Sequence, residues 1–155
     1  MTRIAVGGRV PDFRLPATSG QEISLKALRG GAVVLYFYPR DHTSGCTAEG
    51  CDFRDHSAAF RAAGVTILGV SRDTVASHEK FRAKHDFPFD LLADEDEHLC
   101  QLFDMIRPKT LYGRKIVGIE RSTFLIDARG VLRQEWRKVR VAGHATEVLE
   151  AARNL

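Results

Sequence analysis

Apolar residues along the chain gather into short runs that predict buried strands separated by helices. Residues 32–38 are nearly all apolar and rich in β-branched and aromatic types, which is typical of a strand buried on both faces. Residues 65–71 repeat this pattern. Between the two runs, apolar residues at near-helical spacing continue to about Ala63 and stop before Gly64, which favours a helix end.

Turn residues and spacing predict the remaining elements. Alternating apolar residues around the turn 17–20 indicate a hairpin, and the polar, glycine-containing stretch 107–119 is expected to be a loop. The expected elements are a hairpin at 12–16 and 22–25, a strand at 32–38, a helix reaching about 63, a strand at 65–71, a helix from Asp73 or Thr74 to about 85, a short strand at 89–94, a short helix at 97–103, a strand at 121–127, a turn at 128–130, a paired strand at 131–141 and a helix at 145–153.

This order of elements predicts an α/β protein with a central mixed β-sheet flanked by helices. Strands and helices that alternate and then give way to a hairpin and a helix have the layout of a thioredoxin-like fold. The first hairpin is then an N-terminal extension of that fold. Residues 1–155 show no repeat, low-complexity tract or linker, so we expect a single domain.

Composition and charge exclude several classes of function. Hydrophobic residues make up 44% of the chain and charged residues 28%, which are ordinary values for a globular protein. A net charge of +3 on scattered positions argues against a nucleic-acid partner. No segment approaches the about 18 apolar residues of a membrane span, and the N-terminus lacks the apolar core of a signal peptide. We therefore expect a cytoplasmic protein.

The placement of Cys46 predicts a reactive thiol. In a reducing cytosol cysteines seldom serve as structural cross-links, so the three cysteines of the chain indicate redox or metal chemistry. Cys46 lies where the strand at 32–38 gives way to a helix. The unpaired N–H groups and partial positive charge of a helix N-terminus favour the thiolate, which is the nucleophilic form.

Three further residues are candidates for the pocket around this sulfur. Thr43 can fold its hydroxyl back onto the first helical turn, and Pro39 can exclude water above the site. Arg121 begins a later strand whose start can bring a guanidinium to the same pocket, where it would favour a thiolate and polarise an O–O bond. The residues alone are equally consistent with Thr43 as a simple helix cap, and for an arginine such as Arg121 they favour a surface charge. His42 is a further candidate for tuning the pocket.

Cys51 is a candidate resolving thiol. Five residues along one regular helix place its Cα about 8–9 Å from that of Cys46, whereas a disulfide tolerates about 7 Å. The helix must therefore unwind locally before the two sulfurs can bond. Gly45 and Gly50 lower the cost of unwinding because glycine is a poor helix former. The alternative is that Cys51 is an inert buried thiol.

Cys100 and the possibility of a metal site give weaker indications of function than Cys46 does. Cys100 follows the acidic run 94–97, which disfavours a thiolate, so we expect a packing residue, with a back-up resolving role as the alternative. The spacing of the cysteines does not match structural zinc sites. A binding module of thioredoxin-like fold that holds copper or zinc through Cys46, Cys51 and a histidine remains as a rival from another functional class.

The residues around Cys46 resemble a known active-site motif. Pro39-x-x-x-Thr43-x-x-Cys46 is similar to that of the peroxiredoxins, and the surrounding stretch 36–55 resembles the PrxQ, or bacterioferritin comigratory protein, subfamily. One departure is Ser44, where this subfamily usually has a proline that pre-organises the helix. Further similarities cover nearly the whole chain and lie at Pro11-Asp12-Phe13, Gly69-Val70-Ser71, Asp73, Lys80-Phe81 and 118–127.

This resemblance implies an atypical two-cysteine thiol peroxidase without a metal or organic cofactor. Cys46 would be the peroxidatic cysteine, oxidised to a sulfenic acid by hydrogen peroxide or an organic hydroperoxide. Cys51 would then form an intramolecular disulfide with it. Pro39, Thr43 and Arg121 would line the pocket, together with backbone N–H groups at the start of the helix.

The resemblance also implies partners and a role in the cell. Thioredoxin would reduce the disulfide by thiol exchange, with glutaredoxin and glutathione as the alternative donor. The subfamily implies a monomer that acts in antioxidant defence and redox homeostasis. A redox sensor that passes oxidation to a partner protein would need the same sulfenic acid at Cys46.

Overall fold

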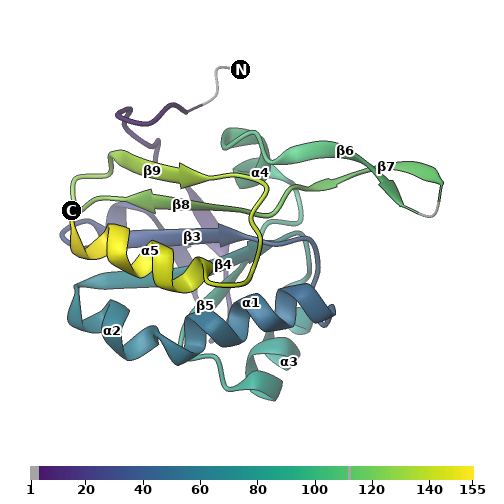
Figure 1. The fold of residues 1–155 in the computed structure, drawn as a ribbon, viewed down its shortest axis with the longest axis horizontal. Helices are drawn as coiled ribbons and strands as arrows, with labels where there is room; N and C mark the ends of the chain where they lie inside the picture. Colours follow the sequence, from purple (N-terminus) through teal and green to yellow (C-terminus); the bar gives the residue numbers. More distant parts are fainter. Residues whose placement is uncertain (1–3, 112) are drawn as a thin grey trace.

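A five-stranded mixed sheet forms the centre of the computed structural model, which describes residues 4–111 and 113–155 (Figure 1). The strands are β1 (Arg14–Pro16), β2 (Glu22–Ser24), β3 (Ala32–Phe37), β4 (Val65–Ser71), β5 (Asp90–Ala93), β6 (Ile106–Leu111), β7 (Arg114–Ile119), β8 (Ser122–Ile126) and β9 (Leu132–Trp136). The helices are α1 (Ser44–Asp55), α2 (Ser57–Ala62), α3 (Val75–His85), α4 (His98–Leu102), α5 (His144–Arg153) and a short 3-10 helix, Lys26–Leu28.

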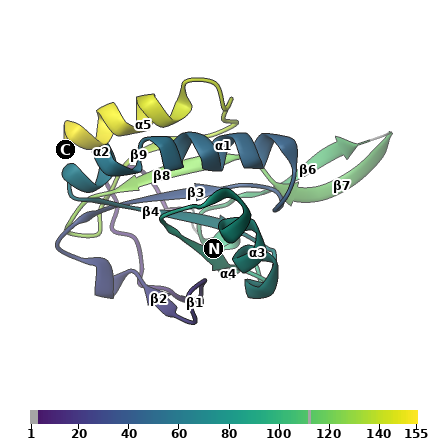
Figure 2. The same cartoon turned by 90° about the horizontal axis from the view of Figure 1, so that it is seen from below.

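The strand order of the central sheet is β5-β4-β3-β8-β9. β3, β4 and β5 are parallel, while β8 runs antiparallel to β3 and β9 antiparallel to β8. Helices α1, α2 and α5 lie together on one side of the sheet, and the β1–β2 hairpin lies on the other (Figure 2). The expected mixed sheet with flanking helices and an N-terminal hairpin is confirmed.

β3 is the middle strand of the sheet, and its two faces are buried because other elements pack on both sides of the sheet. Val33, Leu35 and Phe37 belong to the core cluster that also contains residues of α4. Val34 and Tyr36 point to the opposite face and pack with residues of α1, α2 and α5. Side chains on a strand alternate between faces, so a strand covered on both sides is apolar at every position.

The expected continuous helix after β3 is interrupted. α1 ends at Asp55 and α2 begins at Ser57, with His56 between them at φ −101° and ψ 2°. The ring Nδ1 of His56 lies 2.8 Å from the carbonyl oxygen of Asp52, where a side-chain hydrogen bond competes with the helical pattern. Gly64, at φ +74°, follows the end of α2 as expected.

Two expectations for the second half of the chain were wrong. The predicted loop at 107–119 is an antiparallel hairpin, in which β6 pairs with β7 from Ile106 opposite Ile119 to Leu111 opposite Arg114. The hairpin extends beyond the body of the molecule (Figure 1). The strand predicted at 131–141 ends at Trp136, because Lys138 at φ +53° turns the chain away from the sheet.

No helix among the described residues is long and apolar enough to cross a membrane.

The sheet brings two distant segments to one end of the molecule. β3 leads directly into residues 39–43, which we call the active-site loop, and then into α1. In the β3–β8 register, Phe37 lies opposite Ser122, so the residue before β8 reaches the same end of the sheet as the active-site loop. That residue is Arg121.

Gly69 of β4 provides a test of the close packing under α1. A Cβ at this position would lie 2.7 Å from Leu91 Cδ2 and 2.9 Å from the Cζ of Tyr36, both fully buried. We expect Gly69→Ala to lower the free energy of unfolding by about 1–3 kcal/mol through overpacking. Urea denaturation measures this, with Thr66→Ala, at an exposed position of β4, as the control. Equal stability of Gly69→Ala and wild type would contradict this packing.

Candidate active site

Cys46 is buried in the first turn of α1 and is contacted by Arg121. Only 1% of its surface is exposed. The Nη2 of Arg121 donates a hydrogen bond to Cys46 Sγ at 3.3 Å. A charged donor at this distance favours a thiolate and lies where the oxygen of a bound substrate would be polarised. The sequence-based pairing of Cys46 with Arg121 in one pocket matches this geometry.

Glu49 is the site residue that sequence reasoning missed. The Nη1 of Arg121 donates to Glu49 Oε1 at 2.6 Å, and both side chains are mostly buried. Cys46 and Glu49 are three residues apart in α1, so they share a helix face. Arg121 therefore bridges them. The i, i+3 spacing was visible in the sequence, but an acidic residue at this spacing is common on helices.

Burial and the neighbouring charges have opposite effects on the pKa values of Glu49 and Arg121. It raises the pKa of Glu49 to about 7, although Arg121 opposes this rise. The second carboxyl oxygen, Oε2, is buried without a hydrogen-bond partner. Burial acts to lower the pKa of Arg121, but the charges of Glu49 and Cys46 outweigh it and raise the pKa above its ordinary value. The guanidinium thus stays charged at any physiological pH.

Gly45 allows this contact to form. A Cβ at position 45 would lie 3.2 Å from Arg121 Nη2, so a larger residue would push the guanidinium. Gly50, on the same helix, leaves room for the Phe87 ring instead, because a Cβ there would clash with that ring. Both glycines are thus explained by close packing in the helical form, in addition to the ease of unwinding expected from the sequence.

Thr43 and Pro39 lie in the active-site loop, and neither side chain caps α1 by a hydrogen bond. Thr43 is the N-cap residue of α1, but its side chain makes no capping hydrogen bond. Its hydroxyl proton is directed at the Arg40 carbonyl oxygen, at 2.9 Å. Pro39 is half-buried and borders a cavity of about 390 Å³ shared with Arg72. The contacts around Cys46 therefore join Arg121 to the sulfur directly, whereas Thr43 and Pro39 belong to the adjoining loop.

Cys51 lies in the same regular helix as Cys46. All three cysteines are free thiols, and Cys51 is half-buried against the cluster that contains Phe53 and Phe60. Both residues belong to α1, which keeps their Cα atoms about 8–9 Å apart. The helical form is thus incompatible with a Cys46–Cys51 disulfide.

Cys100 is placed as a packing residue. It is fully buried in α4, and burial, with Asp94 beside it, raises the pKa of its thiol far above the ordinary value. Its backbone N–H donates to Asp94 Oδ2 at 2.8 Å. A thiol that remains protonated and inaccessible is a poor nucleophile.

Within residues 4–111 and 113–155, the grouping with metal-like spacing contains no cysteine. It consists of Asp41, Asp73 and His78, whose ligand atoms lie within 4.8 Å of one another. These atoms already take part in hydrogen bonds to one another or to neighbouring groups. The rival hypothesis of a copper or zinc site built on Cys46 and Cys51 finds no support in this arrangement.

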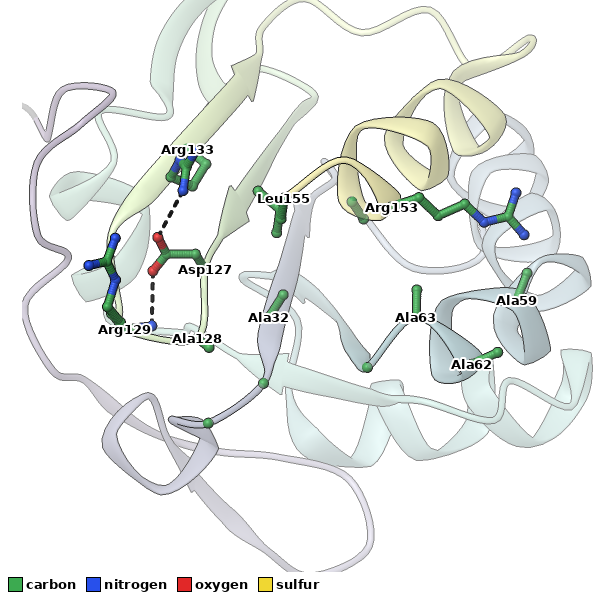
Figure 3. Close-up of a pocket in the computed structure, with 14 residues that line it drawn as sticks. Ala32, Ala59, Ala62, Ala63, Asp127, Ala128, Arg129, Arg133, Arg153 and Leu155 are labelled. Carbon is green, nitrogen blue, oxygen red and sulfur yellow. Dashed lines mark hydrogen bonds and ion pairs between the residues drawn. The ribbon is translucent and has the colours of Figure 1, made fainter.

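A cavity of about 660 Å³ lies at the opposite end of the sheet (Figure 3). Most of the residues that line it are glycine or alanine, including Ala32 and Ala63. Of its charged groups, Arg133 pairs with Asp127 at 3.3 Å, while the Arg153 side chain extends outward from α5 (Figure 3). The cavity offers no nucleophile, so its size does not make it the reactive site.

Comparison with known proteins decides the family. The model of the AhpC/TSA family matches residues 6–135. The chain belongs to the AhpC/TSA family. A curated relative in this family, peroxiredoxin Bcp of Xanthomonas campestris, is 51% identical over 140 residues, which cover 90% of this chain and 88% of the relative. The chain is accordingly a peroxiredoxin, a peroxidase that uses a cysteine thiol.

Solved structures of other peroxiredoxins share the fold closely. The bacterioferritin comigratory protein of X. campestris, described in a study of its alkyl peroxide reduction, superposes with a TM-score of 0.87 at 49% identity, covering 92% of this chain and 90% of that one. A cysteine-to-serine mutant of Xylella fastidiosa PrxQ superposes with a TM-score of 0.93 at 39% identity, covering 99% and 98%. The resemblance to the PrxQ subfamily is thereby confirmed.

Glu49 should make stability depend on pH. The folded protein holds a proton on Glu49 up to about pH 7, whereas the unfolded chain releases it near the ordinary pKa of 4.5. Because the folded state binds more protons in this window, the free energy of unfolding should fall as pH rises through it. Between pH 5 and 7.5 wild type should lose on the order of 2 kcal/mol more than Glu49→Gln. Urea denaturation at both pH values measures this.

The matched control is Glu150→Gln, at an exposed position of α5. It should follow the pH dependence of wild type. Parallel curves for Glu49→Gln and wild type would show that Glu49 does not titrate in this window.

Proposed function

We propose that Cys46 is the peroxidatic cysteine and Cys51 the resolving cysteine of this peroxiredoxin. The single observation that carries the proposal is the 3.3 Å contact between Arg121 Nη2 and the sulfur of Cys46 in the first turn of α1. It gives this cysteine a permanent positive charge and a helix N-terminus as neighbours. Cys100 also lies in a first helical turn, in α4, but there burial and the neighbouring Asp94 carboxylate outweigh the effect of Arg72 and raise the pKa of the thiol.

The first step is attack of the Cys46 thiolate on one oxygen of a hydroperoxide. A new S–O bond forms, the O–O bond breaks, and the departing oxygen takes a proton to leave as water or an alcohol. Cys46 becomes a sulfenic acid. Arg121 stabilises the negative charge that builds on the departing oxygen, and its bridge to Glu49 holds the guanidinium in position before substrate arrives.

The second step joins Cys46 to Cys51. The Cys51 thiolate attacks the sulfenic sulfur, a disulfide forms, and the hydroxyl leaves as water after taking up a proton. The starting helix holds the Cα atoms too far apart for this bond, so α1 unwinds between residues 46 and 51. Local unwinding would also expose Cys46, a residue that is only 1% exposed in the helix.

The cycle closes when an external dithiol reduces the disulfide. We propose thioredoxin as the donor, with glutaredoxin and glutathione as the alternative. Organic hydroperoxides as well as hydrogen peroxide are proposed substrates, in keeping with the alkyl peroxide reduction studied in the X. campestris relative. A monomer in the reducing cytoplasm suits this cycle, because Cys46 and Cys51 must return to free thiols after each turnover.

Cysteine variants test these roles. With thioredoxin, its reductase and NADPH, we expect wild type and Cys100→Ser to consume peroxide continuously and Cys46→Ser to be inactive. Cys51→Ser should oxidise once and then fail to recycle through thioredoxin, because no resolving thiol is present. NADPH oxidation at 340 nm measures turnover. Continuous turnover by Cys46→Ser would overturn the proposal, and a single stoichiometric turnover of wild type would overturn only the choice of donor.

Arg121→Lys tests the bridging guanidinium. Lysine keeps the charge but cannot contact Cys46 and Glu49 at once through two nitrogens. We expect the second-order rate constant of Cys46 with hydrogen peroxide to fall about 100-fold, comparable to the loss of one oxyanion-hole donor. The control is Arg133→Lys at the opposite end of the sheet, which should react like wild type. Stopped-flow single-turnover kinetics give both rates, and an unchanged rate for Arg121→Lys would rule out this role.

A further inference from the structure

The active-site loop is fastened to the body of the protein through one buried carboxylate. Asp41 is only 4% exposed. Its Oδ1 accepts a hydrogen bond from Tyr38 Oη at 2.7 Å, and its Oδ2 accepts one from Ser77 Oγ at 2.8 Å. The Nδ1 of His78 lies 2.8 Å from the same Oδ2. Asp41 therefore links the loop to α3, which contributes Ser77 and His78.

His78 is held between two hydrogen-bond acceptors. Its ring is fully buried, and its Nε2 lies 2.9 Å from the carbonyl oxygen of Leu92, which cannot donate. Its Nδ1 faces the Asp41 carboxylate, which already accepts two hydroxyl protons. A ring whose two nitrogens both face acceptors must carry a proton on each. With a proton on each nitrogen, the ring would donate to both acceptors and form a buried ion pair with Asp41.

The surroundings of Asp41 favour its carboxylate form. Burial acts to raise the pKa of Asp41, but the hydrogen bond and charge of His78 outweigh it, together with the bonds from Tyr38 and Ser77. The pKa of the carboxyl group lies below its ordinary value. Breaking one side of such a pair leaves the other charge buried and uncompensated, which makes the pair a strong determinant of local structure.

The loop needs this attachment because other forces hold it weakly. His42, the next residue, has a φ of +62°, a backbone conformation that non-glycine residues seldom adopt without support. Its ring touches Phe81 of α3 edge-on at 5.1 Å between centroids. A cavity of about 340 Å³ borders the loop, Asp73 and Ser77, so this side is not closely packed. The backbone N–H of Asp41 donates to Asp73 Oδ2 at 2.9 Å and adds a second polar attachment.

We propose that the Asp41–His78 ion pair is a positioning device for the peroxide reaction. It fixes the active-site loop to α3, so that Pro39 and Thr43 keep their places while α1 unwinds between Cys46 and Cys51. The inference rests on the roles proposed above for the two cysteines. Both members of the pair lie outside residues 46–51, so the attachment persists in the thiol and disulfide forms. Asp41 and His78 act through the loop and touch neither substrate nor sulfur.

Two reactions of Cys46 separate positioning from stability. If the active-site loop beside Cys46 helps to place the peroxide, the peroxide reaction depends on the position of that loop, whereas alkylation by iodoacetamide depends mainly on the thiolate and its exposure. We expect Asp41→Asn and His78→Gln to slow the peroxide reaction about 10- to 100-fold, the scale expected for reacting groups displaced by a fraction of an ångström. Alkylation of Cys46 should change less than about threefold, because the first turn of α1 and Arg121 remain.

Matched variants complete the rate comparison. The control Asp127→Asn makes the same chemical change in a carboxylate that accepts backbone N–H bonds at the far end of the sheet, and both of its rates should equal those of wild type. The double variant Asp41→Asn/His78→Gln should lose less than the product of the single losses, because neither partner is left as an unpaired buried charge. Ser77→Ala removes one bond to Asp41 and gives a milder variant should the others fail to fold.

Nitrogen-15 spectra of the wild-type His78 ring test the ion pair without any substitution. We expect both ring nitrogens to show the protonated signature of an imidazolium, in the reduced and in the disulfide form. A neutral ring, unchanged peroxide rates in the folded variants, or equal loss of peroxide reaction and alkylation would each overturn the inference. If wild-type Cys46 itself fails to react with peroxide, the proposed function fails instead, and the spectra still decide whether the ion pair exists.

Discussion

The contact of Arg121 with both Cys46 and Glu49 is the interaction on which the site depends. The three residues come from α1 and from the residue before β8, and only the pairing of β8 with β3 brings them together. The side chains are mostly buried, so the guanidinium acts in a medium where water screens its charge weakly. Glycine at position 45 keeps the approach open. Sheet register and glycine thus combine to place the Arg121 guanidinium against Cys46 at the start of α1.

A second constraint is that the folded helix α1 prevents a later step of the reaction cycle. α1 must be helical to hold Cys46 against Arg121, yet the same helix keeps Cys46 and Cys51 too far apart to bond. The peroxidatic arrangement and the disulfide are therefore two different structures of one segment. The absence of a side-chain cap at Thr43 makes the first turn cheaper to open. The active-site loop beside it is anchored separately through Asp41, so unwinding of the helix need not disorder the whole site.

Much of this fold could be predicted from the sequence, because its strongest signals are local. The uninterrupted apolar run of β3 identified a central strand, and the spacing of Pro39, Thr43 and Cys46 identified the motif. The hairpin of β6 and β7 was missed because its basic residues and glycine are typical of a loop rather than of alternating strands. Glu49 and the pairing of Asp41 with His78 were missed for another reason: each depends on a contact between segments far apart in sequence, which no local pattern encodes.

The central claim is that Cys46 attacks the peroxide and Cys51 resolves it, and the most direct test is disulfide mapping. The reduced protein would be treated with one equivalent of hydrogen peroxide, blocked with an alkylating agent and digested for peptide mass spectrometry. The account predicts one peptide pair joined through Cys46 and Cys51, with Cys100 alkylated as a free thiol. Recovery of Cys46 as an unoxidised thiol, or a disulfide that includes Cys100, would contradict it.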